Sequence, residues 1–456
     1  MSTTFELSPR RKTVVLLTCC LSLLIVSMDA TIVNVAVPAI RDDLHASTAR
    51  LQWIIDIYTL TLASVLLLSG AMADRFGRRR VFRIGLTLFA LGSLLCSMAP
   101  TIEALIGARF LQALGGSMLN PVAMSIITQV FTGKVERARA IGVWGAVVGI
   151  AMALGPIVGG VLIDALGWPS VFWINLPICA AALVLTTVYV PESKSATPRG
   201  IDPIGQLLAI ALMFTLVFGL IEQMPLMFVV ATLAGIAFVW YESRHRQPFI
   251  DLRFFRSAPF SAATVIAVCA FATFGAFLFT CSIYLQSVRG YSAVHTGMLY
   301  LAMAGAMLIF SPLSGRLVGK YGTRPSLLAA GAFMTIAAVL LTRLDASTPE
   351  WALIVTFAIF GIGFGMVNAP ITTAAVSGMP LDRAGAAAAV ASTSRQAGTS
   401  IGVALAGTVA GAGLWWVLAA LTAGIAILGI VANTAWAERS RARVAPILDQ
   451  KVPAHA

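Results

Sequence analysis

The chain has 456 residues, of which 59% are hydrophobic and 11% charged, and its mean hydropathy is +0.90. That composition leaves too little polar surface to keep domains of this length soluble, which excludes an ordinary soluble protein and makes the bilayer the solvent. The net charge of +12 and the pI near 9.9 are also typical of nucleic-acid-binding proteins, so the position of the charges has to decide between the two.

Apolar runs long enough to cross a hydrocarbon core of about 30 Å as helices recur along the chain. The first continues from 13 to 38, is longer than the apolar region of a signal peptide and contains Asp29, so we interpret it as a retained span. In chain order, the predicted spans cover residues 13–38, 50–72, 81–98, 101–124, 139–163, 170–189, 204–221, 225–241, 259–286, 295–314, 325–342, 351–377, 385–409 and 412–434.

A repeat divides these spans. The segment Gly70-Ala-Met-Ala-Asp74-Arg75-Phe-Gly77-Arg78-Arg79 follows the second span and is echoed after the tenth by Gly315-Arg-Leu-Val-Gly-Lys-Tyr-Gly-Thr-Arg324. The sequence therefore predicts an all-α integral membrane fold of 14 transmembrane helices, arranged as 6 + 2 + 6 with two pseudo-symmetric halves. The predicted parts are an N-terminal six-helix half (1–190), two inserted helices with a cytoplasmic linker (191–258), a C-terminal six-helix half (259–436) and a cytoplasmic tail (437–456).

The basic residues indicate the orientation. Of the 31 Lys and Arg residues, two lie in the interior of predicted spans, and only four lie in or at the edge of loops predicted to be outside, namely Arg41, Arg50, Arg289 and Arg343. The remaining 25 lie in cytoplasmic loops and tails, or at the span ends that border them, if the N-terminus is inside, and an even number of spans then places both termini in the cytoplasm. The basic pI is thus a sign of topology. We expect membrane lipid as a partner and no nucleic acid.

A parallel duplication of this kind is expected of a transporter, and the ionisable groups within the spans indicate how its transport would be driven. No GxxxxGK[ST] segment is present, so we expect neither ATP nor any other cofactor, and a proton gradient as the driving force. The four histidines lie in loops or tails and the six cysteines lack metal-ligand spacing, which leaves the carboxylates of Asp29 and Asp56 to titrate, with no metal site. Asp29, Arg109 and Asp56 are the predicted proton-coupling residues. The alternatives are that Asp29 bonds Thr31 or caps a helix break, that Arg109 snorkels or braces helices, and that Asp56 lies in an outer vestibule.

Three further motifs lie within spans. They are Leu105-Ile-Gly-Ala-Arg109-Phe-Leu-Gln112-Ala-Leu-Gly115 in the fourth span, Gly155-Pro156-Ile-Val-Gly159-Gly160 in the fifth, and Ser394-Arg395-Gln396-Ala-Gly398 in the thirteenth. With the loop from Gly70 to Arg80, they resemble the major facilitator superfamily, and within it the fourteen-span drug:proton antiporters. The resemblance implies a major facilitator fold, a gating motif (Gly70, Asp74, Arg75, Gly77 and Arg78) and an antiporter motif (Gly155, Pro156, Gly159 and Gly160).

The resemblance also implies export of lipophilic, often cationic compounds in exchange for protons by alternating access, from a monomer in the cell inner membrane. The predicted substrate cavity contains Asp29, Asn34, Asp56, Tyr58, Gln112, Arg395 and Gln396. One alternative is an exporter of the same fold for a specific natural product or metabolite. A membrane enzyme is disfavoured, since no histidine lies in the interior of a span and no HxxxxD or GxSxG is present. A receptor would have no need of the repeat or of charges within the membrane.

Overall fold

In the computed structural model, regular secondary structure is entirely helical over the described residues, which are 8–195, 200, 202–245, 248–377, 379, 381–409 and 411–449. The helices separate into two compact units. The first comprises Met1–Ile201 and Leu285–Met298, and the second comprises Asp202–Tyr284 and Leu299–Ala456. These units are defined by internal contacts, so the predicted boundaries at 190, 258 and 436 stay predictions.

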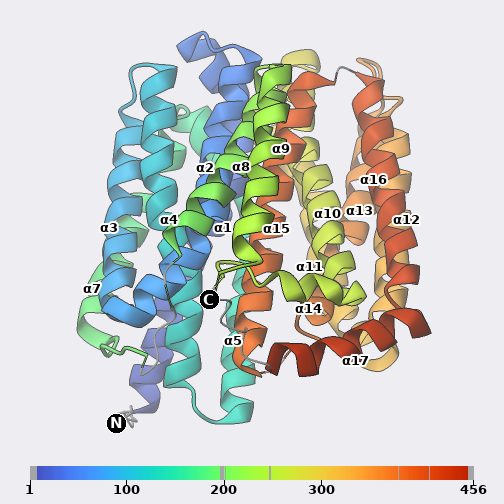
Figure 1. The fold of residues 1–456 in the computed structure, drawn as a ribbon. Coiled ribbons are helices and arrows are strands. Elements are labelled where there is room, and N and C mark those ends of the chain that lie inside the picture. The colour runs from blue at the N-terminus through green and yellow to red at the C-terminus, as the bar shows by residue number, and fades with distance from the viewer. Residues whose placement is uncertain are drawn as a thin grey trace. The chain divides into compact units, whose positions relative to one another are not determined.

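In the described part of the first unit, seven helices precede residue 190 (Figure 1). They are α1 (Pro9–Leu44), α2 (Thr48–Phe76), α3 (Arg78–Ser97), α4 (Ile102–Val130), α5 (Lys134–Leu166), α6 (Ser170–Trp173) and α7 (Asn175–Tyr189). Side-chain oxygens of Ser8, Ser47 and Thr101 accept hydrogen bonds from the first turns of α1, α2 and α4, which is how these sequences begin their helices. The hydrophobic core of the unit includes Phe82, Phe89 and Leu119, all fully buried.

The second unit contains the remaining helices. They are α8 (Pro203–Ile221), α9 (Pro225–Glu242), the short η1 (Leu252–Arg256), α10 (Ala258–Ile283) with its π-helical extension η2 (Tyr284–Val288), α11 (Ala293–Tyr321), α12 (Thr323–Leu341), α13 (Glu350–Gly365), α14 (Asn368–Val376), α15 (Leu381–Thr408), α16 (Ala412–Val431) and α17 (Ala435–Asp449). Most of η2 and the first turns of α11, up to Met298, belong to the first unit. The two antiparallel helices α8 and α9 pair with each other, and α8 also packs on α15.

The same packing occurs within each unit. In the first unit α1 packs along α5 and α3 along α4, and in the second α10 packs along α15 and α12 along α13. The turn glycines Gly77 and Gly322, which are 245 positions apart in the sequence, both have positive φ, at 113° and 78°. One position before each motif lies a buried serine: Ser69 is 3.2 Å from Ser117, and Ser314 is 2.6 Å from Ser326. The internal repeat thus extends from sequence to local structure.

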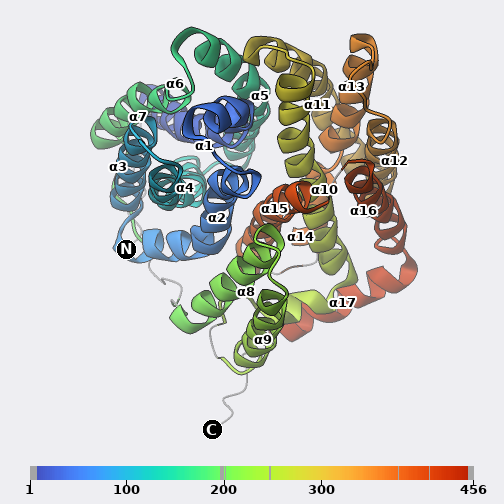
Figure 2. The same ribbon diagram turned by 90° about the horizontal axis from the view of Figure 1, so that it is seen from above.

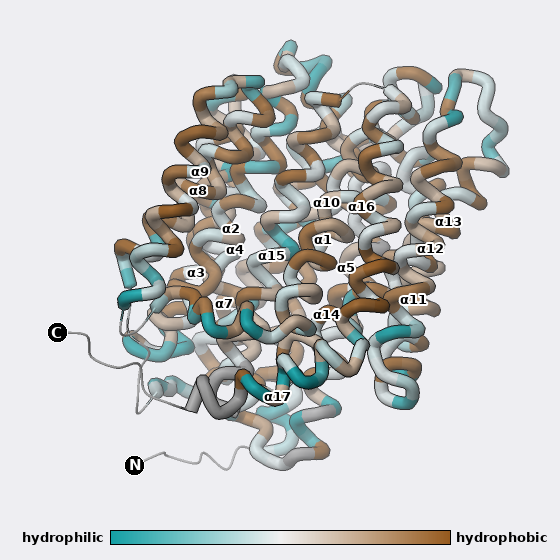
Figure 3. The backbone as a smooth tube through the Cα atoms, turned by 45° about the vertical axis from the view of Figure 1, so that its right-hand side comes forward, coloured by the Kyte–Doolittle hydropathy of each residue, from teal (hydrophilic) through white to brown (hydrophobic). Residues whose placement is uncertain are grey.

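Hydrophobic residues recur along the helices, as the brown stretches of Figure 3 show, and twelve helical spans of the described residues are long and apolar enough to cross a membrane. The bent helix α5 makes a thirteenth if its two parts are one span. α15, with the polar sequence Ser394-Arg395-Gln396, is not among them, so the predicted count of fourteen stays a prediction. The predicted tail from 437 contains most of α17, a helix that apolar runs did not indicate, because charged residues interrupt its sequence.

Candidate functional site

A buried ion pair lies at the centre of the first unit. Arg109 of α4 is 1% exposed and Asp29 of α1 is fully buried. Arg109 Nη1 donates to Asp29 Oδ2 at 2.5 Å and to Gln112 Oε1 at 2.6 Å, and its Nε donates to the backbone carbonyl of Ile54 in α2 at 3.2 Å. Two of the three predicted proton-coupling residues are therefore in direct contact, and a buried charge pair needs such hydrogen bonds to offset its desolvation.

The other carboxylate oxygen of Asp29 also accepts hydrogen bonds. Its Oδ1 accepts a hydrogen bond from Gln112 Nε2 at 2.9 Å and another from Asn175 Nδ2 of α7 at 3.3 Å. Both amides also donate to Ser93 Oγ of α3, at 2.8 Å and 3.3 Å. Arg109, Gln112 and Asn175 thus all approach the Asp29 carboxylate as donors, which is the arrangement that suits an ionised carboxylate.

Aromatic rings close the site around the guanidinium. The Arg109 Cζ lies 4.1 Å from the centre of the Tyr58 ring of α2 and 5.8 Å from that of Phe172 in α6. A guanidinium over an aromatic face is stabilised by the ring's quadrupole, more strongly where water is excluded. Figure 2 shows α4 between α1, α2 and α3, the helices from which most of these groups come. We call Asp29, Ser93, Arg109, Gln112 and Asn175 the buried polar network.

The remaining predicted cavity residues of this unit have different surroundings. Asp56 is fully buried in α2, between Ile54 and Tyr58, which both contact Arg109. The Asn34 amide donates to the carbonyl of Ala30 at 3.0 Å within its own helix. Gln112 was predicted to line a substrate cavity, and in this structure its side chain serves the buried polar network. The roles of all these residues in transport stay predictions.

The predicted gating motif forms the turn between α2 and α3. Asp74 accepts from Arg78 Nη2 at 3.0 Å, and Arg78 Nη1 donates to Gln129 of α4 at 2.8 Å. Gly77 has φ 113°, where side chains other than glycine are strained, and Gly70 lies within α2 with only ordinary contacts. Arg75 is exposed beside Phe76, with 5.9 Å between its Cζ and the ring centre.

A segment after α7 binds across this turn, which the sequence did not indicate. Glu192 Oε1 accepts from the backbone N–H of Arg79 at 3.2 Å, so it caps the first turn of α3. Two backbone hydrogen bonds join the same stretches of chain: Arg78 N to Ser193 O at 2.9 Å and Ser195 N to Asp74 O at 3.0 Å. A Cβ on Gly77 would lie 2.6 Å from Glu192 Oε1. We call residues 190–195 the strap.

The predicted antiporter motif allows close helix packing. A Cβ on Gly155 would collide with the Thr31 side chain of α1, and one on Gly159 would lie 2.6 Å from Ile32. On Gly160 it would lie 2.5 Å from the carbonyl of Ala293 at the start of α11. Small residues of this kind let transmembrane backbones approach, so α5 is held between α1 and the start of α11.

The α5 helix also bends. Its parts Val135–Met152 and Leu154–Leu166 differ in direction by 40°. Pro156 lies four residues after Met152, where its ring clashes with the preceding turn and removes a backbone hydrogen bond. Beyond the bend, Asp164 accepts from the N–H groups of Ala293 and Val294 at 3.3 and 3.1 Å, which caps the start of α11.

The second unit contains the two other predicted cavity residues. Arg395 and Gln396 of α15 are both half-buried. Arg395 Nη2 donates to Thr372 Oγ1 of α14 at 2.6 Å, and its Cζ lies 6.0 Å from the centre of the Phe271 ring. These residues belong to a different unit from the buried polar network, so a cavity that they share with Asp29 stays a prediction.

Aromatic rings occupy the interior of the second unit. Phe274 and Phe277 of α10 stack on Phe364 and Phe360 of α13, with ring centres 4.3 and 4.2 Å apart. Phe274 and Phe277 therefore pack against a neighbouring helix in this structure.

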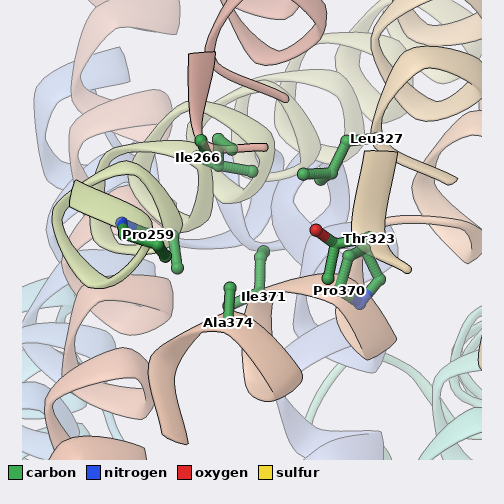
Figure 4. Close-up of a pocket in the computed structure, with 9 residues that line it drawn as sticks. Pro259, Ile266, Thr323, Leu327, Pro370, Ile371 and Ala374 are labelled. Carbon is green, nitrogen blue, oxygen red and sulfur yellow. The ribbon is translucent and has the colours of Figure 1, made fainter. Parts of the chain in front are cut away.

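A small apolar pocket also lies in the second unit (Figure 4). It opens at the ends of α10, α12, α14 and α16, and its volume is about 260 Å³ with the mouth included. Its lining consists of Pro259, Ala263, Ile266, Thr323, Leu327, Pro370, Ile371, Ala374 and Ala432. It lacks charged groups and is smaller than most drug-sized ligand pockets, so we assign it no substrate. Among the described residues, no group of three or more His, Cys, Asp or Glu side chains is placed to hold a metal ion.

Sequence reasoning missed Ser93, Asn175 and Glu192. Asn175 stands in the segment Trp173-Ile-Asn175-Leu-Pro177 at the start of a predicted span, and a polar amide there was the available signal. Ser93 gave no comparable signal, because serines satisfy themselves on their own helix backbone in many spans.

Known proteins with similar sequences are named as drug resistance and export proteins. The chain is 37% identical over 389 residues to the multidrug resistance protein Stp of Mycobacterium tuberculosis (strain CDC 1551 / Oshkosh), covering 83% of this chain and 72% of Stp. It is 35% identical over 395 residues to the tetracenomycin C resistance and export protein of Streptomyces glaucescens, covering 84% and 73%. The crystal structure of the peptide transporter POT in complex with sulfate has the same fold, with a TM-score of 0.70 over 94% of this chain and 95% of that chain, at 16% identity.

A family model covers most of the sequence as well. Residues 19–403 match the model described as Major Facilitator Superfamily, which includes both the buried polar network and most of α15. The match covers far more than half of the chain, and the relatives are similar over more than four fifths of it. The chain therefore belongs to the major facilitator superfamily and is a multi-pass membrane protein.

Proposed function

We propose that the protein exports lipophilic, drug-like compounds, often cations, in exchange for protons by alternating access. The observation that carries the proposal is the ion pair of Asp29 and Arg109, buried in a chain whose relatives are named as drug resistance and export proteins. Placing a charge pair in the membrane interior costs free energy, so such pairs occur mainly at functional sites.

The donor groups around Asp29 suggest how a proton would be coupled to movement. Arg109, Gln112 and Asn175 all donate to its carboxylate. A protonated Asp29 would carry no negative charge to pair with Arg109, and its O–H would itself need an acceptor. The network therefore has to rearrange when a proton binds. Because six helices contribute to the buried polar network and to the aromatic rings around it, that rearrangement is a candidate for the local event that biases one cavity state over the other.

The packing of α5 supports the proposed gate. Gly155, Gly159 and Gly160 leave no room for a Cβ between this helix and α1 or the start of α11. Packing this close seals the contact against water and ions, and the bend before Pro156 gives one part of α5 a different direction from the other. Such a seal keeps the proton path and the outward path from being open at once.

We further propose the finer architecture. α5 as one span and α15 as another would bring the count to fourteen, in the order 6 + 2 + 6, with α15 as the counterpart of α5 because it packs along α10 as α5 packs along α1. Both termini would be cytoplasmic in the cell inner membrane, on the distribution of Lys and Arg. The protein would act as a monomer, without ATP or another cofactor and without catalysing a reaction.

A second candidate is an exporter dedicated to one natural product. It is favoured by the similarity to the tetracenomycin C resistance and export protein, whose name specifies one compound. The proton-coupling part of the proposal is the same in both cases. Only the range of substrates differs.

An efflux assay separates these candidates. The protein is expressed in a host stripped of its own exporters and challenged with quaternary ammonium compounds, dyes and neutral antibiotics, and then reconstituted in proteoliposomes with an imposed pH gradient. The proposal expects export of several classes, with protons released when substrate is added. Export of a single class would favour the dedicated exporter, and transport insensitive to the pH gradient would contradict proton coupling.

A further inference from the structure

The C-terminal helix α17 lies across the ends of other helices of its unit. Just before it, Asn433 accepts from Thr323 Oγ1 at the start of α12 at 2.9 Å. Further along, Ser440 Oγ accepts from the backbone N–H of Ala258 at the start of α10 at 2.9 Å, and Arg441 Nη1 donates to Ser377 Oγ at the end of α14 at 3.0 Å. Figure 1 shows α17 running across these helices where they end. A helix that connects the ends of spans on one side lies along the membrane surface.

The side chains of α17 are divided by face. Ala437 and Val444 are buried, at 0% and 2% exposed, and Ser440 and Arg441 make the contacts just given. At about 100° per residue, Trp436, Arg439 and Arg443 fall within about 60° of one another on the adjoining flank. The acidic Glu438 lies on the other flank. We call Trp436, Arg439 and Arg443 the basic flank.

The basic flank has no partner of its own in the described part of the chain. Trp436 is 65% exposed, and the side chains of Arg439 and Arg443 are exposed and make no hydrogen bond or ion pair with the other described residues. Arg441, between them, is already bonded to Ser377. An indole this exposed is unfavourable in bulk water and favourable at headgroup level, where its ring meets acyl chains and its N–H meets polar groups.

We propose that the basic flank of α17 is a binding site for acidic phospholipid, with Trp436 inserted at the interface and the two arginines on the headgroup phosphate. A helix with a buried apolar face, a basic flank and an exposed tryptophan, lying in the membrane plane, has the features of an interfacial lipid-binding helix. Guanidinium groups form charge-assisted, two-pronged hydrogen bonds with phosphate, so the occupant is anionic. Through its contacts with α10, α12 and α14, the bound lipid would hold the ends of these helices together.

The test uses the full chain in nanodiscs of phosphatidylcholine with increasing phosphatidylglycerol. Native mass spectrometry measures lipid binding directly. Brominated phosphatidylglycerol quenches tryptophan fluorescence, and the contribution of Trp436 is the part of the fluorescence that is lost in Trp436→Phe. The double variant Arg439→Gln/Arg443→Gln should weaken phosphatidylglycerol binding roughly 30-fold, the effect of two surface charges near an anionic lipid. The pair Arg439→Lys/Arg443→Lys should keep most of the affinity, because the charge remains.

A matched control removes the same charge elsewhere. Arg80 and Arg83 are exposed on α3, and Arg80→Gln/Arg83→Gln should leave the quenching of Trp436 unchanged. Inorganic phosphate at millimolar concentration should not displace the lipid, which separates a lipid site from a site for free phosphate. Equal losses of phosphatidylglycerol binding in Arg439→Gln/Arg443→Gln and Arg80→Gln/Arg83→Gln would overturn the proposal. Unchanged binding by Arg439→Gln/Arg443→Gln, or quenching that does not depend on lipid charge, would also overturn it. None of these readouts depends on transport.

Discussion

The carboxylate of Asp29 is surrounded by three donors, from Arg109, Gln112 and Asn175. Asp29→Asn keeps the size of the side chain but removes its charge and its titration. We expect proton-driven transport to fall at least about tenfold, the change that about 1.4 kcal/mol produces, while a fluorescent substrate still binds. Substrate uptake against a pH gradient and proton release on substrate addition, both in proteoliposomes, measure the effect.

Asp29→Glu is the control for this variant, because it keeps the titrating group and should retain part of the coupling. Parental export by Asp29→Asn of both a neutral and a cationic substrate under an imposed pH gradient would remove Asp29 as the proton carrier. Asp56, buried in the neighbouring helix, would be the next residue to test.

The guanidinium of Arg109 satisfies Asp29 and also the carbonyl of Ile54. Arg109→Ala leaves a buried carboxylate without its partner, a change that costs about 3–5 kcal/mol in buried pairs. We expect transport to be lost while the protein still inserts, and Arg109→Lys to restore only part of it, since an ammonium lacks the planar fork. Efflux rates and the amount of protein in membranes are measured together. Full transport by Arg109→Ala would make Arg109 a structural residue.

At the scale of the element, α5 provides a matched pair of glycines. A Cβ at Gly160 would lie 2.5 Å from the carbonyl of Ala293 and 2.7 Å from the Cα of Val294, whereas at Gly149 it would meet nothing within 4 Å. Gly160→Ala should lower the free energy of unfolding by about 1–3 kcal/mol and reduce transport, because the backbone of α11 cannot shift without losing packing. Gly149→Ala should be neutral or slightly stabilising, since alanine favours helix. Thermal melts in detergent compare the two, and equal melts would show that the contact does not hold α5.

The turn between α2 and α3 provides a second pair of glycines to compare. Gly77→Ala places a Cβ at φ 113° and against Glu192, while Gly70→Ala meets only Pro121 at 3.9 Å. We expect Gly77→Ala to be destabilising by about 1–3 kcal/mol and Gly70→Ala to be tolerated. The cost of Gly77→Ala should be smaller in a Glu192→Ala background than in the parent, because the collision with the strap is then removed. If the cost is equal in the two backgrounds, backbone strain is the whole effect.

At the scale of the whole molecule, the distribution of Lys and Arg predicts cytoplasmic termini. In a background with the six cysteines replaced, Ser8→Cys should react with a membrane-impermeant maleimide only after the cells are opened. Arg343→Cys, in a loop predicted to be outside, is the opposite control and should react in intact cells. Labelling of Ser8→Cys from outside would reverse the topology. Ala454, the other terminal position predicted to be inside, lies outside the described residues.

Much of the architecture could be predicted from the sequence, because the bilayer imposes long apolar helices and makes charges within them conspicuous. The contact between Asp29 and Arg109 follows from that logic, since neither charge can be left alone in the interior. The contributions of Ser93 and Asn175 depend on the rotation of α3 and α7 about their axes, which hydropathy does not specify. The strap depends on backbone hydrogen bonds, which carry no side-chain signature, and α17 was missed because its apolar face is narrow.

The two units differ in what fills their centres. The position that corresponds to Asp29, 245 residues on, is Phe274, which stacks on Phe364, so an ion pair in one unit is matched by hydrocarbon in the other. At this position one half of the duplicated chain thus holds charged groups, and the other holds uncharged rings. A substitution among the stacked rings can change the shape of that half without changing its charge. If transport is coupled to protons as proposed, variants of these rings can differ in what they carry and still move the same charge in each cycle.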